Sequence, residues 1–264
     1  MIELSDIAIT FNKRTPLEMQ ALRGVSLAIP KGQFVTMIGS NGAGKSTLLN
    51  ILSGELIPDA GRVELDDTDV TTWPIYARAP MIARLFQDPR SGLCEQMSIL
   101  ENIAIASGRT SPRGFGFAIT EALRKRAVER LATLGLGLEK RLDDRVALLS
   151  GGQRQALSLI MATFGSAKIL LLDEHTAALD PNAADLVMGL TDAVVQQFQI
   201  TTVMVTHSMR QALDFGDRII MLHQGGVIFD ISGPERASVT LNNLLDLFRR
   251  KEGRDLADDQ LLLG

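Results

Sequence analysis

The residue types with the most evident chemistry stand together in one loop of glycines, a lysine and hydroxyl side chains. The loop consists of Gly39, Ser40, Asn41, Gly42, Ala43, Gly44, Lys45, Ser46 and Thr47. Glycine adopts backbone angles that are closed to other residues, so successive N–H groups can converge on one anion. The spacing fits G-x-x-x-x-G-K-[ST], in which the lysine lies at the β- and γ-phosphates and the next hydroxyl ligates Mg²⁺. The loop therefore predicts a nucleotide site, with Lys45 at the phosphates and Ser46 at the metal.

Two carboxylates stand at the end of an uninterrupted apolar run. Residues 169–172 are all apolar, and Asp173 and Glu174 follow them. Such a run is typical of a strand buried on both faces of a parallel sheet, whose carboxyl end is the ligand edge. Asp173 is therefore predicted to hold the Mg²⁺ and Glu174 to accept a proton from an attacking water. Helix caps or surface charges are the alternative interpretation.

Two further positions could contact an anion. Ser150, with Gln153 three residues later, has the form of a capping box and predicts that a helix begins there. A helix N-terminus flanked by glycines is a possible second anion site, or simply a well-capped helix. His207 follows the predicted strand 201–206 at the edge where the phosphates are expected, which favours a functional role.

These residues require an α/β framework to position them. Residues 34–38 predict a buried strand before the phosphate loop and residues 46–52 a helix after it, whose dipole favours a bound anion. Other strands are expected at residues 2–10, 23–29, 62–65, 82–86, 169–174, 201–206, 218–222 and 227–229. Helices are expected at residues 99–105, 119–134, 181–194 and 241–248. The sequence thus predicts a P-loop NTPase core with a mainly parallel sheet, an N-terminal antiparallel β subdomain and an inserted α-helical subdomain.

The expected organisation is one domain over residues 1–264. Its nucleotide-binding core with the antiparallel subdomain covers residues 1–87 and 151–235, the helical subdomain residues 88–150, and a helical tail residues 236–264. The charged side chains of residues 121–130 are most simply a solvated helix face.

Composition limits the classes of partner. The formal net charge of −4 argues against nucleic acid as the main partner. The single cysteine, Cys94, excludes an internal disulfide and is expected to be a small packed apolar residue. No signal peptide and no apolar run of membrane-spanning length is visible, so a cytosolic location is expected.

Taken together, the sequence resembles the ATP-binding subunit of an ABC transporter over about residues 1–235. Besides the phosphate loop, the resemblance is carried by Leu171-Leu172-Asp173-Glu174, Leu149-Ser150-Gly151-Gly152-Gln153, Gln87, Ala178-Leu179-Asp180 and His207. In this family two subunits pair head to tail, and each ATP lies between the phosphate loop of one subunit and the signature, residues 149–153, of the other.

The resemblance implies a role for each matching residue. Ser150 and Gly152 would contact the γ-phosphate of the partner's ATP. Gln87 would touch the Mg²⁺ and the attacking water, and would couple the site to a membrane subunit on the helical subdomain. His207 would hold the γ-phosphate, and Asp180 would contact the opposite protomer. The cofactors implied are ATP and Mg²⁺.

Two positions depart from the family pattern. The family stacks adenine on a tyrosine before the phosphate loop, where this chain has Phe11, which can stack but has no hydroxyl; its only tyrosine is Tyr76. His175 stands where many members have proline. The form of residues 173–180 looks like a branch of bacterial importer ATPases that work with a separate substrate-binding protein.

The expected function is ATP hydrolysis in a dimer of this chain, or in a pair with a second ATPase subunit, that drives transport through integral membrane permease subunits. The chain would then lie on the cytoplasmic face of the cell membrane. An exporter or a lipid-extraction complex is the main alternative. An ABC ATPase of DNA repair or translation is disfavoured because the chain has no long coiled-coil insertion, and the signature disfavours a P-loop kinase or GTPase. The cargo cannot be read from this sequence, since other subunits select it.

Overall fold

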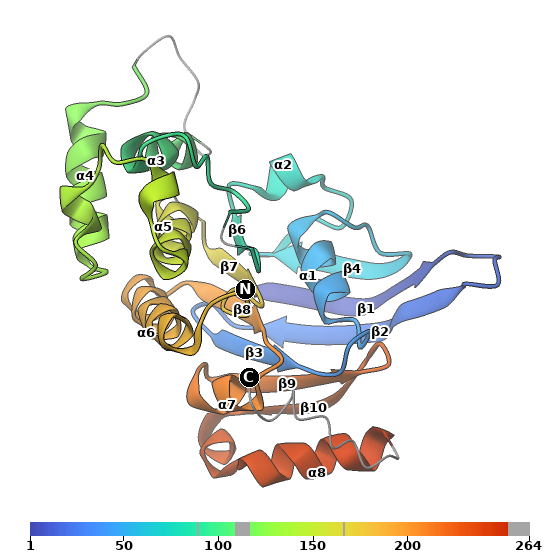
Figure 1. Cartoon of the computed structure of the whole chain (residues 1–264). Helices are drawn as coiled ribbons and strands as arrows, with labels where there is room; N and C mark the ends of the chain where they lie inside the picture. The colour runs from blue at the N-terminus through green and yellow to red at the C-terminus, as the bar shows by residue number, and fades with distance from the viewer. Residues whose placement is uncertain (89, 109–116, 166, 253–264) are drawn as a thin grey trace. The chain divides into compact units, whose positions relative to one another are not determined.

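The computed structural model describes residues 1–88, 90–108, 117–165 and 167–252. The chain forms two compact units, which are described separately (Figure 1). The first consists of Met1–Arg78 and Phe198–Gly264, and the second of Ala79–Gln197. The second unit groups the helical segments with the strands and helices that carry the carboxylates and the signature, so the boundaries predicted at residues 87 and 150 stay a prediction.

An antiparallel sheet begins the first unit. Its strands are β1 (Ile2–Phe11), β2 (Met19–Ile29), β4 (Ala60–Leu65) and β5 (Thr68–Asp69), in the order β2-β1-β4-β5. Buried residues alternate with more exposed ones along β1, as expected for a sheet with one covered face. The β2 strand is longer than predicted, because the hairpin continues its pairing from Ile2↔Ile29 as far as Phe11↔Met19.

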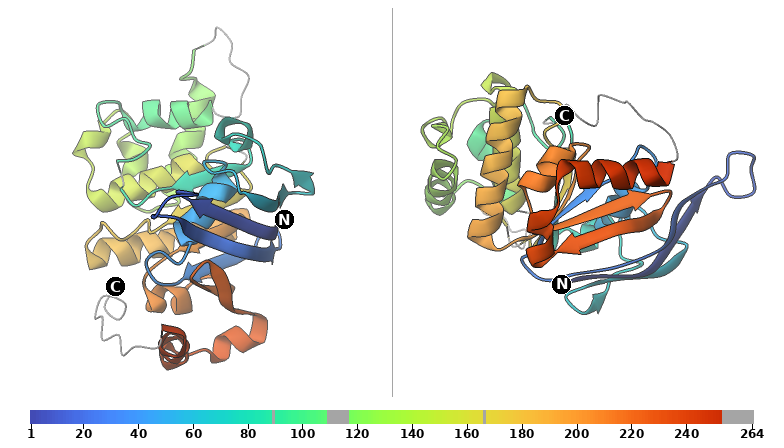
Figure 2. Two further views of the ribbon diagram at one scale, coloured as in Figure 1. Left: turned by 90° about the vertical axis from the view of Figure 1, so that its right-hand side faces the viewer. Right: turned by 90° about the horizontal axis from the view of Figure 1, so that it is seen from below.

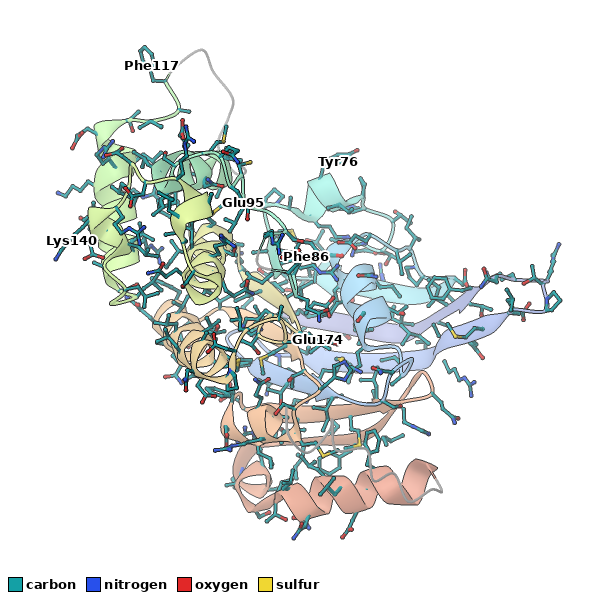
Figure 3. All side chains as sticks on the ribbon, viewed as in Figure 1. Tyr76, Phe86, Glu95, Phe117, Lys140 and Glu174 are labelled. Atoms are coloured by element: carbon teal, nitrogen blue, oxygen red, sulfur yellow. The ribbon has the colours of Figure 1, made fainter. Side chains whose placement is uncertain are left out.

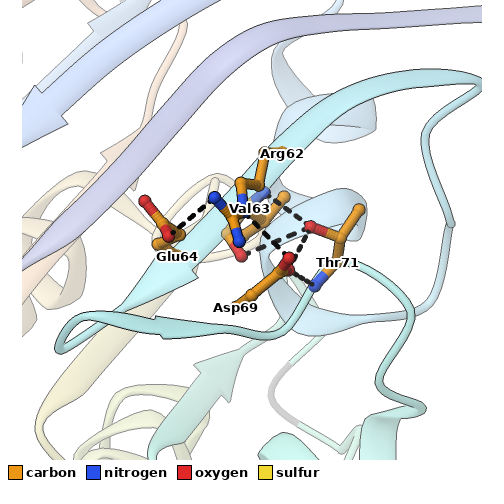
Figure 4. Close-up of polar contacts among 5 residues, drawn as sticks. All are labelled: Arg62, Val63, Glu64, Asp69 and Thr71. Atoms are coloured by element: carbon orange, nitrogen blue, oxygen red, sulfur yellow. Dashed lines mark hydrogen bonds and ion pairs between the residues drawn. The ribbon is translucent and has the colours of Figure 1, made fainter.

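The β4–β5 hairpin is stabilised by a cluster of polar contacts, drawn in Figure 4. One oxygen of Asp69 accepts hydrogen bonds from the Thr71 hydroxyl at 2.6 Å and the Thr71 amide at 2.9 Å. Its other oxygen accepts from Nε of Arg62 at 2.8 Å. These bonds, that of the Thr71 hydroxyl first, lower the pKa of Asp69 to about 2. The carboxylate therefore stays charged wherever the protein is folded near neutral pH.

Parallel strands of the first unit carry the phosphate loop. β3 (Phe34–Ile38) runs parallel to β8 (Thr201–Val205) on one side and to β9 (Arg218–His223) on the other, and β10 (Gly226–Ser232) pairs antiparallel with β9. All five residues of β3 and of β8 are buried. This burial on both faces explains why neither strand carries a charged residue.

The helices of the first unit are α1 (Lys45–Ser53), the short α2 (Ile75–Arg78), α7 (Met209–Asp214), the 3-10 helix η3 (Gly233–Ser238) and α8 (Leu241–Glu252). Figure 2 shows α8 lying along β9 and β10. Its Leu244 and Phe248 pack in one cluster with Met209, Ile219 and Met221. The predicted tail is therefore a packed helix as far as it is described, and the acidic residues after it lie outside the described part.

The second unit contains the parallel pair β6 (Ile82–Leu85) and β7 (Ile169–Asp173). Its helices are α3 (Ile99–Ser107), α4 (Glu121–Ala132), α5 (Gly151–Thr163) and α6 (Pro181–Phe198), with 3-10 turns η1 (Leu138–Lys140) and η2 (Val146–Leu148). One apolar cluster joins α3, α4 and α5, with Leu123, Ala127 and Leu131 on the buried face of α4. The predicted helical character of this segment is confirmed.

Three details of the predictions are wrong. The helix expected from Ile119 begins at Glu121, because the side chain of Thr120 accepts from the amide of Leu123 and caps it. The first strand of the second unit ends at Leu85, and Phe86 lies in the following loop. Cys94 is exposed rather than packed, since it stands in a loop that precedes α3.

Among the described helices, none has both the length and the apolar character needed to cross a bilayer.

Candidate nucleotide and magnesium site

The phosphate loop follows β3 and leads into α1, as its sequence requires. Gly39, Gly42 and Gly44 have φ angles of 151°, 77° and 104°, all in the region that favours glycine. A Cβ on Gly39 would lie 2.2 Å from the carbonyl oxygen of Leu222 on β9. The loop is therefore fixed in this path both by backbone angle and by the close approach of β9.

Lys45 begins α1 and its side chain folds back over the loop. The residue is 5% exposed, and Nζ donates to the carbonyl oxygens of Gly39 at 2.7 Å and Ser40 at 3.0 Å. The ammonium is thus held inside the curve of the loop, next to the positive end of the helix dipole. Asn41, Gly42 and Ser46 are exposed around it. This arrangement suits an anion that approaches from solvent.

His207 lies at the same sheet edge as the phosphate loop. β3 and β8 are parallel, with Met37 opposite Val205, and the amide of Thr206 donates to the carbonyl of Met37 at 3.1 Å. Both strands therefore end together, and half-buried His207 follows one as Gly39 follows the other. The turn after β8 is braced by the Thr206 hydroxyl, which donates to Oε1 of Gln211 at 2.6 Å.

In the second unit the structure brings Gln87, Asp173 and Glu174 to one edge. β6 and β7 are parallel, with Leu85 opposite Leu172, so the residues that follow these two are neighbours at the carboxyl ends. Figure 3 labels Phe86 and Glu174, which stand just beyond the ends of β6 and β7. Gln87 is exposed and both carboxylates are half-buried.

Glu174 has a left-handed backbone with φ of 48°. For a residue with a Cβ this region costs about 1–3 kcal/mol, and such residues are concentrated at active sites. The turn that imposes it is closed by the amide of Ala177, which donates to the carbonyl of Glu174 at 2.9 Å. The chain therefore leaves the path of β7 at the residue predicted to be the general base.

His175 is a buried support under this turn. It is 1% exposed, and its Nε2 lies 3.2 Å from the hydroxyl oxygen of Thr191 on α6. That hydroxyl donates its own hydrogen to the carbonyl of Val187 at 2.8 Å, so Nε2 of His175 is the donor in the pair. Burial lowers the pKa of His175 to about 4. The residue is therefore a neutral tether between the turn and α6.

Arg84 is a residue of this site that the sequence analysis missed. Its Nη2 lies 2.7 Å from Oδ2 of Asp173, and its guanidinium lies over the Phe86 ring at 4.9 Å from the centroid. A charged residue inside the otherwise apolar strand Ile82–Leu85 was the available signal.

The signature forms the predicted helix start. Ser150 is the N-cap of α5, its hydroxyl accepting from the amide of Gln153 while Oε1 of Gln153 accepts from the amide of Ser150. Ser150 and Gly151 are exposed and Gly152 is buried. A Cβ on Gly152 would lie 3.3 Å from the Cβ of Ala183 on α6. The capping box is thus present, and the glycines let α6 approach α5 closely.

Asp180 and Phe11 occupy positions consistent with their predicted elements. Oδ1 of Asp180 accepts from the amide of Ala183 at 3.1 Å at the start of α6, and the residue is exposed. Phe11 is half-buried at the end of β1, opposite Met19. The roles of both residues in binding a nucleotide or a partner stay predictions.

The predicted metal contacts fit Mg²⁺. They are a carboxylate, an amide and a hydroxyl, from Asp173, Gln87 and Ser46, and all three supply hard oxygen ligands. Among the described residues no group of three His, Cys, Asp or Glu side chains could enclose an ion. This is the donor set of an ion that keeps water and substrate phosphates in its coordination shell rather than of one caged by protein.

Comparison with known proteins identifies the family. A family model described as ABC transporter matches residues 22–177. The chain belongs to the ABC transporter family. A tyrosine transport ATP-binding protein of Clostridioides difficile is 42% identical over 94% of this chain and 98% of its own length. A phosphonates import ATP-binding protein of Chromohalobacter salexigens is 35% identical over 80% of this chain and 78% of its own.

The fold of this ABC protein agrees with that of a solved ATP-binding cassette. A dimeric cassette in a post-hydrolysis state with ADP and Pi superposes with a TM-score of 0.73, at 31% identity, over 88% of this chain and 98% of its own. The predicted family and fold class are confirmed, as is the prediction of an ATPase subunit of a transport complex.

Proposed function

We propose that this ABC ATPase hydrolyses ATP as one half of a head-to-tail pair and thereby drives import through separate membrane permease subunits. The observation that carries the proposal is the division of the chemistry between exposed edges. One edge carries the phosphate loop and His207, another carries Gln87, Asp173 and Glu174, and the start of α5 exposes Ser150 and Gly151.

Each residue has a defined task in hydrolysis. Lys45 and the loop amides bind the phosphates and neutralise the charge that spreads over the γ-phosphoryl oxygens in the transition state. Ser46, Gln87 and Asp173 would hold Mg²⁺, which would supply positive charge to offset that of the phosphates. Glu174 orients a water and takes its proton, and its strained, tethered backbone keeps the carboxylate in position for that step.

The start of α5 supports an intersubunit role for the signature. Its exposed N-terminal amides and the hydroxyl of Ser150 can donate to an anion that comes from outside the chain. The γ-phosphate on the phosphate loop of a second subunit has this chemistry. His207 would contact the same phosphate from its own subunit, Asp180 would contact the opposite protomer, and Phe11 would stack on the adenine.

A role in transport requires further protein partners. Integral membrane permease subunits would dock on the helical subdomain and hold this chain at the cytoplasmic face of the membrane, with a substrate-binding protein acting on the other side. Relatives named for tyrosine transport and phosphonates import favour import over export. Amino-acid uptake is therefore the first assay for cargo, and no nucleic-acid partner is proposed.

Glu174→Gln tests the assignment of the general base. The variant keeps the size and the backbone strain of the residue but cannot accept a proton, so ATP turnover should fall by about 10²–10⁴-fold. Because ATP then persists, a dimer with bound ATP should accumulate in size-exclusion chromatography. Glu129→Gln, on the exposed face of α4, is the matched control and should behave as wild type. Turnover within twofold of wild type in Glu174→Gln would refute the role of Glu174.

A permease partner is tested by purification from membranes. The tagged full chain should copurify with a polytopic membrane protein, and stimulation of its ATPase by a cargo-loaded binding protein supports import. ATP-driven accumulation of cargo inside inverted vesicles, whose outer face is the cytoplasmic one, would contradict the proposed direction.

A further inference from the structure

Arg84 lies close to Asp173 and Gln87, which are both predicted to bind the same Mg²⁺. Its side chain is 10% exposed, and Nη2 pairs at 2.7 Å with Oδ2 of Asp173, whose side chain is 18% exposed. The same guanidinium stacks on Phe86, the residue immediately before Gln87. One side chain thus contacts one predicted ligand directly and lies against the neighbour of the other.

The geometry of the pair favours an orienting contact over a surface ion pair. Both side chains are largely removed from solvent, which strengthens a charge-assisted hydrogen bond and limits the number of rotamers each can adopt. A guanidinium is planar, so it can hold a carboxylate at its edge while its face covers an aromatic ring. One guanidinium thus makes both contacts.

A second contact fixes the same loop from α5. Nε2 of Gln155, which is buried, donates to the carbonyl of Phe86 at 3.4 Å. Phe86 is therefore held on its ring by Arg84 and on its backbone by the signature helix. Phe86 is bonded directly to Gln87, so these two contacts restrain the backbone on one side of Gln87.

We propose that Arg84 is a positioning residue for the magnesium site, which orients Asp173 directly and Gln87 through Phe86. The inference rests on the proposed function, because it assumes that Asp173 and Gln87 share one Mg²⁺. Groups that bond to metal ligands commonly change metal affinity by about 10–100-fold when they are removed, although they do not touch the ion. Because Arg84 pairs with a predicted metal ligand, its removal should change the contribution of the metal to nucleotide binding.

The test is the effect of Mg²⁺ on nucleotide affinity. The Kd of a non-hydrolysable ATP analogue is measured on the full chain in EDTA and in excess Mg²⁺, and the ratio of the two reports the metal contribution. In Arg84→Met we expect this ratio to fall about tenfold, with the Kd in EDTA unchanged. Arg84→Lys, which can still pair with Asp173, should recover most of the ratio.

Arg126→Met is the matched control. Arg126 lies over Phe164 at the same 4.9 Å and donates to its carbonyl oxygen, but it belongs to α4 and to no predicted metal contact. The variant Arg126→Met loses a similar stacking contact and should keep the wild-type ratio of the Kd in EDTA to the Kd in Mg²⁺. If Arg84→Met also weakens binding in EDTA, Arg84→Gln replaces it as the variant without charge.

The possible results distinguish the role of Arg84 from the presence of the magnesium site. A wild-type ratio in the uncharged Arg84 variant overturns the inference while the magnesium site stands. A ratio above that of wild type overturns it too, since Arg84 would then compete with the ion. A ratio near one in the wild-type protein overturns the magnesium part of the proposed function itself.

Discussion

His175 should make the stability of this protein fall in mild acid. Burial lowers its pKa from 6.5 to about 4, because the enclosed ring would lose its hydration if it were charged. Between these two values the unfolded chain binds a proton and the folded chain does not, so stability is present above pH 6.5 and is lost as the pH falls through the window. Each pKa unit is worth 1.36 kcal/mol, so the full loss is about 3 kcal/mol.

The loss of stability can be measured between pH 8 and pH 5, without going down to the pKa of His175 in the folded protein. At pH 5 the linkage relation gives a loss of about 2 kcal/mol relative to pH 8. Urea unfolding at pH 8, 7, 6 and 5 gives the free energy of unfolding for wild type and for His175→Gln. Glutamine does not titrate and its amide can still donate to Thr191, so the difference between the two proteins isolates the proton on His175.

Because the chain has few histidines, a second histidine variant can serve as the control. The chain has three histidines, and His223→Gln, which removes a half-buried histidine at the end of β9, is the control. From pH 8 to pH 5 the free energy of unfolding of wild type should fall by more than that of His175→Gln. The same comparison with His223→Gln shows whether loss of any histidine has this effect. Parallel curves for wild type and His175→Gln would show that burial does not hold this ring neutral and would refute the reasoning.

Two predictions test the architecture of the first unit. Gly39→Ala should lower the free energy of unfolding by about 3 kcal/mol and abolish nucleotide binding, because its Cβ would lie 2.2 Å from the carbonyl of Leu222. The control Gly42→Ala has open space around it and should lower the free energy of unfolding by about 1 kcal/mol. Arg78→Met should cost about 3 kcal/mol in thermal unfolding, since the buried guanidinium donates to the last carbonyls of α1 at 2.7 and 2.9 Å. A Gly39→Ala protein as stable as wild type would contradict the first, and an unshifted melting temperature of Arg78→Met the second.

Local sequence was sufficient to predict a feature when all the residues that form it lie close together in the chain. The phosphate loop could be predicted because the glycines, Lys45 and Ser46 lie within nine residues and their spacing reflects backbone geometry. The capping box of Ser150 and Gln153 could be predicted for the same reason, since both bonds are made within one turn. The buried strands β3 and β7 were visible as largely apolar runs, because a strand covered on both faces has no polar side.

Element ends were less accurate where a neighbour decides them. The start of α4 moved to Glu121 because Thr120 caps it. β6 ended at Leu85, and Phe86 after it contacts Arg84 of β6 and also Gln155 of α5, which is distant in sequence. Cys94 is exposed, because residue type alone does not reveal whether a loop covers it.

The sequence by itself determined which chemistry the chain carries, since residue types and short spacings suffice to recognise a phosphate loop and a carboxylate pair. Only the tertiary structure decided how that chemistry is held. The contact of Arg84 with Asp173 joins residues 89 positions apart, and that of His175 with Thr191 joins a turn to a helix. Such contacts depend on strand register and helix packing, which are set by the whole core and leave no local pattern in the chain.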